Sequence, residues 1–267
     1  MFLGGLKNLK EQILNSILNK NNANINDIVE KVIDSSQSAI LLYTSYFENL
    51  GNKNSDIDIY VFLPDDTKLD NSNLRKYSNC LGVDVIQAGD LELDIEYWTI
   101  SSIKRIAQKF ADSKGVEGSF VDLKILLRIY HGYFINSSKI SLDISKFIED
   151  IDILQLLKNR ISLEARSLYD EAIKMYEVNE WILALDCARR CIWECASYIN
   201  AYYGKPNLKS KWISKIFLDN AAFGNEEILQ EYLNLQIYSN ISEENIEKKI
   251  LSMFSLIQSM LSVGLFD

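Results

Sequence analysis

The residues with the clearest capacity for chemistry are two aspartates separated by one apolar residue, Asp56-Ile57-Asp58. They open an alternating run in which Ile59 and Val61 continue the apolar positions. In a β-strand this alternation sends both carboxylates to one face, about 6 to 7 Å apart, and the apolar side chains to the other. Two like charges at that spacing repel each other unless a cation or water lies between them. The pair therefore predicts a divalent metal site.

A second acidic segment follows at residues 91–96, where Glu92, Asp94 and Glu96 alternate with leucine and isoleucine. By period two the three acids share one face of a strand. An exposed edge strand with a solvated acidic face is one explanation of such alternation. The preceding aspartate pair favours a different one, in which this strand adds a carboxylate to the same site.

Two other groups of reactive side chains are assigned to packing. Cys187, Cys191 and Cys195 recur every four residues and so form one stripe of a helix, and the sequence offers no fourth ligand for zinc. His131 is the only histidine, and near a predicted helix end it is expected to be a cap or a packed residue. Lys205, Lys209, Lys211 and Lys215 form a basic cluster that is expected to be a solvated helix face.

Composition limits the class of partner. The chain has 267 residues and a formal net charge of −9, which argues against nucleic acid as the main partner because phosphate neutralisation needs a basic face. Its apolar runs are too short to cross a bilayer, and the first residues lack a secretory layout, so no membrane association and a cytoplasmic location are expected. Only two prolines occur, which favours long helices.

Hydrophobic periodicity gives the elements that must position the acids. We expect helices at about 6–18 and 26–34, and strands at 39–44, 56–63, 82–87 and 91–100. Further helices are expected at about 101–110 and 120–134, and from residue 144 to the end only helical periods occur. The sequence thus predicts an α+β fold, with a mixed sheet flanked by helices followed by an all-α bundle.

The stretch from Thr44 to Asp58 resembles the nucleotidyltransferase superfamily of DNA polymerase β. Members carry a Gly-Ser turn, a spacer of about ten residues and an Asp-x-Asp strand preceded by serine, and here Ser45 and Ser55 match these positions. Gly51 lies in the spacer, where glycine is common in the family. Thr44 departs from the pattern because it stands where the family has glycine, so its side chain is expected to narrow the pocket or change how the triphosphate is held.

The resemblance implies transfer of a nucleoside monophosphate from a nucleoside triphosphate, with ATP as the expected donor. It implies two Mg²⁺ ions held by Asp56, Asp58 and Asp94, because hard cations prefer oxygen ligands. The expected nucleotide-binding residues are Thr44, Ser45, Lys53 and Ser55, with Ser45 and nearby backbone amides at a helix start holding the triphosphate. Glu96 or Glu92 is expected to act as general base, a role that Asp94 could also fill.

The same resemblance divides the chain into a nucleotidyltransferase domain at 1–140 and a helical bundle domain at 141–267 that binds the acceptor. The architecture is most like the small-molecule enzymes that modify aminoglycoside and lincosamide antibiotics. The expected acceptor is a hydroxyl of an antibiotic or a biosynthetic intermediate, and a homodimer is compatible with the sequence. The alternative is an antitoxin-like or regulatory protein of the same fold that binds or acts on a protein partner.

Overall fold

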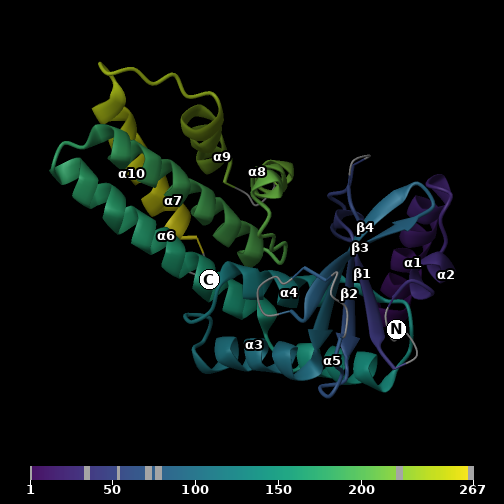
Figure 1. The fold of residues 1–267 in the computed structure, drawn as a ribbon. Coiled ribbons are helices and arrows are strands. Elements are labelled where there is room, and N and C mark those ends of the chain that lie inside the picture. The colour runs from purple at the N-terminus through teal and green to yellow at the C-terminus, as the bar shows by residue number, and fades with distance from the viewer. Residues whose placement is uncertain are drawn as a thin grey trace. The chain divides into compact units, whose positions relative to one another are not determined.

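A computed structural model describes residues 2–32, 37–52, 55–69, 74–75, 80–220 and 225–263 (Figure 1). Within these residues the helices and strands follow the predicted order, with an α/β first part and a helical second part, and the α+β class is confirmed. In chain order the elements are α1 (Phe2–Lys20), α2 (Ile25–Val29), β1 (Ala39–Tyr43), η1 (Ser45–Glu48), β2 (Asp58–Leu63), β3 (Gly82–Ala88), β4 (Leu91–Thr99), α3 (Ile100–Asp112), α4 (Phe120–His131), β5 (Tyr133–Phe134), α5 (Lys139–Glu149), α6 (Ile153–Glu177), α7 (Trp181–Tyr202), α8 (Ser210–Asp219), α9 (Glu226–Tyr232), η3 (Leu233–Ile237) and α10 (Ile246–Leu261).

The five strands form one mixed sheet in the order β3-β4-β2-β1-β5. β2 and β4 run parallel, and the other neighbouring pairs are antiparallel. Because β2 and β4 are parallel neighbours, the chain must cross back between them, and it does so by first forming β3 at the outer edge of the sheet. A tight turn at Gly89-Asp90 then joins β3 to β4. Gly89 has a positive φ of 55°, a conformation that glycine adopts without steric cost.

The two faces of the sheet have different roles. The face covered by α1 and α2 is apolar, because alternate residues of β1, β2 and β4 pack there, among them Leu42, Ile59 and Ile95. The other face carries Tyr43, Asp58 and the remaining alternate positions, and α4 and α5 pack against it. Asp58 and its neighbours Asp94 and Glu96 therefore lie on the face toward α4.

The chain divides into two compact units, the first formed by Met1–Ala111 and Gly118–Ile153 and the second by Asp112–Glu117 and Leu154–Asp267. The first unit thus extends past the expected limit at residue 140. The reason is packing, because α5 contacts β1 and β2 of the sheet rather than the helices that follow. In the second unit, α6, α7, α8, α9 and α10 enclose a separate apolar core that includes Cys191 and Cys195.

Two predicted elements near the start of β2 are shorter than expected. The helix predicted to reach residue 134 stops at His131, and Tyr133–Phe134 pair with β1 instead. The strand predicted from Asp56 begins at Asp58, because β1 ends at Tyr43 opposite Asp58 and offers no partner for the preceding residues. None of the helices among the described residues combines the length and apolar character that a bilayer crossing requires.

Candidate functional site

The candidate site lies where β2 begins. Tyr43 of β1 and Asp94 of β4 are the register partners of Asp58 on either side. Residues that are directly opposite on neighbouring strands project to the same face and lie about 5 Å apart. Asp58 and Asp94 are therefore adjacent on the face toward α4. Of the three acids in residues 91–96, the sheet register brings Asp94 beside the aspartate pair.

Glu96 lies one step deeper on the same face, opposite Tyr60. Its side chain is half-buried, and Trp98 Nε1 donates a hydrogen bond to its Oε2 at 3.1 Å. Burial raises the pKa of Glu96, an effect that the Trp98 hydrogen bond and Lys124 partly oppose. Glu96 and Lys124 line one small pocket on this face with Tyr60 and Trp98. Glu96 is thus a carboxylate whose proton affinity is shifted toward the neutral range.

The remaining acids are less involved. Glu92 is exposed and opposite Gln87 of β3, and it precedes the stretch of β4 that pairs with β2. Asp56 is exposed and precedes β2, so the strand that was predicted to begin at Asp56 does not include this residue. In the described part of the chain, no three His, Cys, Asp or Glu side chains gather closely enough to hold a metal ion. In this arrangement Asp56, Asp58 and Asp94 do not fit the expected two-magnesium site.

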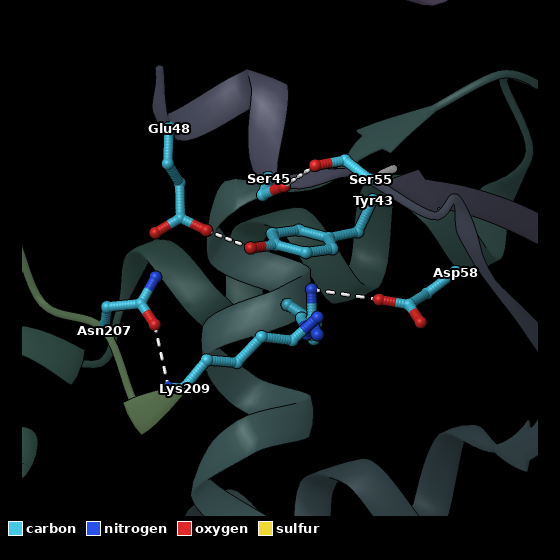
Figure 2. A network of polar contacts seen from close by, with 8 residues as sticks. Tyr43, Ser45, Glu48, Ser55, Asp58, Asn207 and Lys209 are labelled. Carbon is cyan, nitrogen blue, oxygen red and sulfur yellow. Dashed lines mark hydrogen bonds and ion pairs between the residues drawn. The ribbon is translucent and has the colours of Figure 1, made fainter. Parts of the chain in front are cut away.

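Asp58 already has a cationic partner, Arg128 of α4. Arg128 Nη1 lies 3.0 Å from Asp58 Oδ2, and the guanidinium carbon lies 3.6 Å from the centre of the Tyr43 ring. Figure 2 draws the ion pair as the dashed line that ends on Asp58. Arg128 is only 3% exposed, and its Nη2 is buried without a hydrogen-bond partner. A guanidinium rather than an open carboxylate cluster therefore faces Asp58.

Sequence reasoning missed Arg128, although a signal was present. It stands in the run Ile125-Leu126-Leu127-Arg128-Ile129, which is apolar on every side. Arginine is almost never fully buried unless it is paired, so an arginine inside a buried helix predicts a carboxylate opposite it. The sequence could have raised that expectation, but it could not have named Asp58 as the partner.

The predicted phosphate-binding residues form a tight loop after β1. Ser45 Oγ donates to Ser55 Oγ at 3.0 Å, and the backbone N–H of Asn52 donates to the same Ser55 oxygen at 2.9 Å. The helix expected after Ser45 is a single 3₁₀ turn, so no extended row of backbone amides points from its start. Lys53 lies outside the described residues. The loop thus brings Ser45 and Ser55 together beside the start of β2.

Thr44 and Gly51 acquire physical explanations from this loop. Thr44 has extended backbone angles, φ −146° and ψ 150°, which any residue adopts, so glycine is not needed there for conformational reasons. Its side chain is 1% exposed, and its hydroxyl has no hydrogen-bond partner. A side chain at Gly51 would place its Cβ 2.2 Å from the Tyr46 ring. Gly51 is therefore required by close approach rather than by its φ angle.

A second group of polar side chains, around Glu48, was also not predicted from the sequence and lies next to this loop. Glu48 of η1 accepts a hydrogen bond from Tyr43 Oη, and its side chain is 7% exposed (Figure 2). His131 Nε2 lies 3.7 Å from Glu48, while Lys10 Nζ donates to the carbonyl of Gly132 at 3.1 Å. Burial lowers the pKa of His131, and Glu48 opposes that shift. His131 is thus packed at the end of α4, as expected.

The mixed sheet, its helical cover and the appended helical unit define a nucleotidyltransferase-like fold. A crystal structure of a nucleotidyltransferase-like protein from Exiguobacterium sibiricum matches this chain with a TM-score of 0.52 at 12% sequence identity. The match covers 90% of this chain and 76% of that one, so the likeness extends over both units and establishes the fold. No family model and no curated protein sequence matches the chain.

Proposed function

We propose that the chain is a nucleotidyltransferase that transfers a nucleoside monophosphate, AMP from ATP, to a hydroxyl of a small molecule such as an antibiotic or biosynthetic intermediate. The observation that carries the proposal is the juxtaposition of Asp58 and Asp94 on the parallel strands β2 and β4, next to the Ser45–Ser55 loop, within a nucleotidyltransferase-like fold. Mg²⁺ stays a prediction from the sequence, since Asp58 and Asp94 offer the oxygen ligands that it prefers but form no complete metal site with Asp56 in the described structure.

The chain's own residues suit the proton transfer that this reaction needs. The acceptor oxygen bonds to the α-phosphorus, the bond to the leaving pyrophosphate breaks, and the acceptor hydroxyl loses its proton. Glu96 is our proposed proton acceptor, because its burial raises its pKa and it lines a pocket on the acidic face. Glu92 is the weaker candidate, because it is exposed and lies outside the stretch of β4 that pairs with β2.

Binding of the donor is proposed to use the loop after β1. The hydroxyls of Ser45 and Ser55 can donate to phosphate oxygens once their mutual hydrogen bond is exchanged. Thr44 lies next to them with a buried and unpartnered hydroxyl, so its side chain occupies space that a glycine would leave open. We expect this to restrict how closely the triphosphate approaches the backbone.

The test is an acceptor screen with the full chain, Mg²⁺ and each of the four nucleoside triphosphates. Pyrophosphate release that depends on the acceptor, with a product heavier by one nucleoside monophosphate, is expected for at least one hydroxyl compound. Glu96→Gln should lower kcat by about 100-fold or more and remove the rise of kcat with pH through the raised Glu96 pKa. Arg105→Met, an exposed change on α3, is the control. Release that is absent with every donor and acceptor would contradict the proposal.

The Asp58–Arg128 ion pair favours a second candidate, a regulatory or antitoxin-like protein that binds a protein partner and uses the nucleotide site without turnover. A carboxylate neutralised by a buried guanidinium can have a structural role alone. This candidate predicts nucleotide binding by calorimetry with no pyrophosphate release in the same screen. Turnover with any acceptor would exclude it.

A further inference from the structure

The short connection between α6 and α7 leaves three apolar side chains in solvent (Figure 1). Val178, in the connection, is 61% exposed, and Ile182 and Leu183, in the first turn of α7, are 76% and 51% exposed. Single exposed apolar residues are common on protein surfaces, but several at one point of the fold indicate an interaction surface. We call these three residues the hairpin tip.

The backbone of the hairpin tip is held in a defined conformation. Asn179 has a positive φ of 62°, and its N–H donates to the carbonyl of Tyr176 at 3.1 Å. The N–H of Glu180 donates to the carbonyl of Met175 at 2.9 Å, which completes a Schellman motif at the end of α6. The rings of Tyr176 and Trp181, on either side of the connection, have centroids 5.1 Å apart. Because the tip is already ordered, a partner that binds it has little chain entropy to remove.

Acidic side chains accompany the apolar residues of the tip. Residues 175–187 contain no lysine or arginine but three exposed acids, which are Glu177, Glu180 and Asp186. Glu247 of α10 is also close, because its Oε1 accepts a hydrogen bond from Tyr176 Oη at 3.2 Å. Lys174, which precedes this stretch, is paired with Glu171 at 3.4 Å. The tip therefore combines an apolar centre with a negatively charged rim.

We propose that the hairpin tip is a docking site for a cationic amphipathic helix of another protein. Apolar side chains of that helix would cover Ile182 and its two neighbours in the tip, while lysine or arginine side chains would face the acidic rim. Helices often bind by laying an apolar face on a hydrophobic surface, and complementary charge then selects the partner. Docking at the tip is separate from nucleotide transfer and does not depend on it.

The charges of the rim argue against other occupants of the tip. In a two-fold contact between copies of this chain the tip would meet itself, so Glu177 and Glu180 of one copy would face the same acids of the other. The phosphates of nucleic acid and the headgroups of anionic lipids would be repelled in the same way. A cationic protein segment complements both the apolar centre and the rim.

The experiment measures the binding of two synthetic, fluorescein-labelled peptides to the full chain by fluorescence anisotropy, in about 0.15 M salt. Both peptides are designed as amphipathic helices with the same leucine face, and their remaining positions are lysine in one peptide and glutamate in the other. The lysine peptide should bind at least about tenfold more tightly than the glutamate peptide, because only its charge is complementary to the rim.

A substitution in the apolar centre locates the binding site. Ile182→Ser removes the most exposed side chain of the tip and should weaken binding of the lysine peptide by about tenfold, as expected when one apolar side chain is lost from a contact. Leu142→Ser is the matched control, because Leu142 on α5 is 68% exposed and lies outside the tip. It should leave the affinity unchanged. Both side chains are exposed, so both variants are expected to fold.

A second pair of variants tests the rim. Glu177→Gln combined with Glu180→Gln should weaken binding of the lysine peptide by at least about threefold and reduce its dependence on salt. Glu226→Gln combined with Glu227→Gln removes the same charge from exposed positions of α9. This control should change the affinity by less than about twofold, because its charges are not part of the rim.

Four results would overturn the inference. The first is no binding of the lysine peptide, and the second is equal affinity for wild type and Ile182→Ser, which would mean that only the overall negative charge holds the peptide. The third is a wild-type dimer in sedimentation that Ile182→Ser abolishes, which would assign the tip to a second copy. The fourth is binding to vesicles of phosphatidylcholine and phosphatidylserine that Ile182→Ser abolishes. None of these measurements involves turnover, so the proposed nucleotide transfer is tested separately.

Discussion

At the scale of single residues, the contact between Asp58 and Arg128 has the largest consequences. The arginine is buried and the aspartate is largely so, and a buried pair of opposite charges offsets the cost of removing each from water. Such a pair adds little net stability compared with apolar residues, but the loss of one partner leaves the other charge uncompensated. The same two residues therefore have effects on stability that are separate from any effect on catalysis.

Asp58→Ala should lower the free energy of unfolding of the first unit by about 3 to 5 kcal/mol, because it leaves the Arg128 guanidinium buried and unpaired. Asp94→Ala changes an exposed carboxylate two strands away from β1, and its effect should stay within about 0.5 kcal/mol. Hydrogen exchange of β2 peptides, followed by mass spectrometry, measures the stability of the first unit in each variant. Equal protection in the two variants would mean that Arg128 does not depend on Asp58.

At the scale of elements, α6 and α7 of the second unit carry an unusual carboxylate. Burial raises the pKa of Glu194 on α7 to about 7, and Glu164 on α6 adds to the rise. Arg160 and Arg190 oppose it, and Arg160 forms an ion pair with Glu164 at 3.1 Å. The two glutamates thus share Arg160 in a partly desolvated region, where a second negative charge is unfavourable.

This pKa shift predicts a pH dependence of stability. Glu194 has an ordinary value of 4.5 and a folded value of about 7, so the folded state binds its proton more tightly. Its contribution to stability is fully present below pH 4.5, decreases between pH 4.5 and 7, and is absent above. Glu194→Gln should therefore match wild type near pH 4 and exceed it at pH 8, by on the order of 2 to 3 kcal/mol.

Urea denaturation at several pH values, followed through hydrogen exchange of α7, measures the difference in stability between Glu194→Gln and wild type. Glu177→Gln, an exposed change at the end of α6, is the matched control and should follow wild type at every pH. A Glu194→Gln curve that runs parallel to the wild-type curve from pH 4 to 8 would contradict the assignment of the raised pKa to Glu194.

At the scale of the whole molecule, the chain passes between its two units more than once. Asp112–Glu117 belongs to the second unit, although the segments before and after it belong to the first. This short segment is held on α6, where Asn159 Nδ2 donates to the carbonyl of Lys114 at 2.8 Å. Gly115 has a φ of 89°, and a Cβ there would lie 2.5 Å from the carbonyl oxygen of Leu156. Glycine is thus required at position 115 both by its positive φ and by the close approach of the Leu156 carbonyl.

Gly115→Ala should destabilise the second unit by about 2 to 4 kcal/mol, because backbone strain adds to the clash with Leu156. Gly204→Ala provides a matched control, since Gly204 also has a positive φ of 75° but has open space around its Cβ position. It should cost about 1 kcal/mol from strain alone. Thermal unfolding of both variants measures the difference, and equal losses would mean that the contact with α6 is dispensable.

Much of the fold follows from local patterns in the sequence. Alternation in residues 58–63 and 91–99 indicates strands with one apolar face, and period-3.6 patterns indicate the helices of both units. The strand β5 at Tyr133–Phe134 was not predicted, because a strand of two residues shows no periodicity and forms only by pairing with β1. Likewise α5 was expected in the helical domain, although its apolar face packs on the sheet.

The candidate site divides in the same way. The sequence by itself predicted a strand that begins with the Asp56-Ile57-Asp58 segment, the serines at positions 45 and 55 before it, and an acidic strand after it. Only the tertiary structure decided that Asp94 lies beside Asp58, and that Arg128 returns from α4 to neutralise it. Periodicity reports which face of an element is apolar, but strand order and the partner of a buried charge depend on packing between segments far apart in the chain.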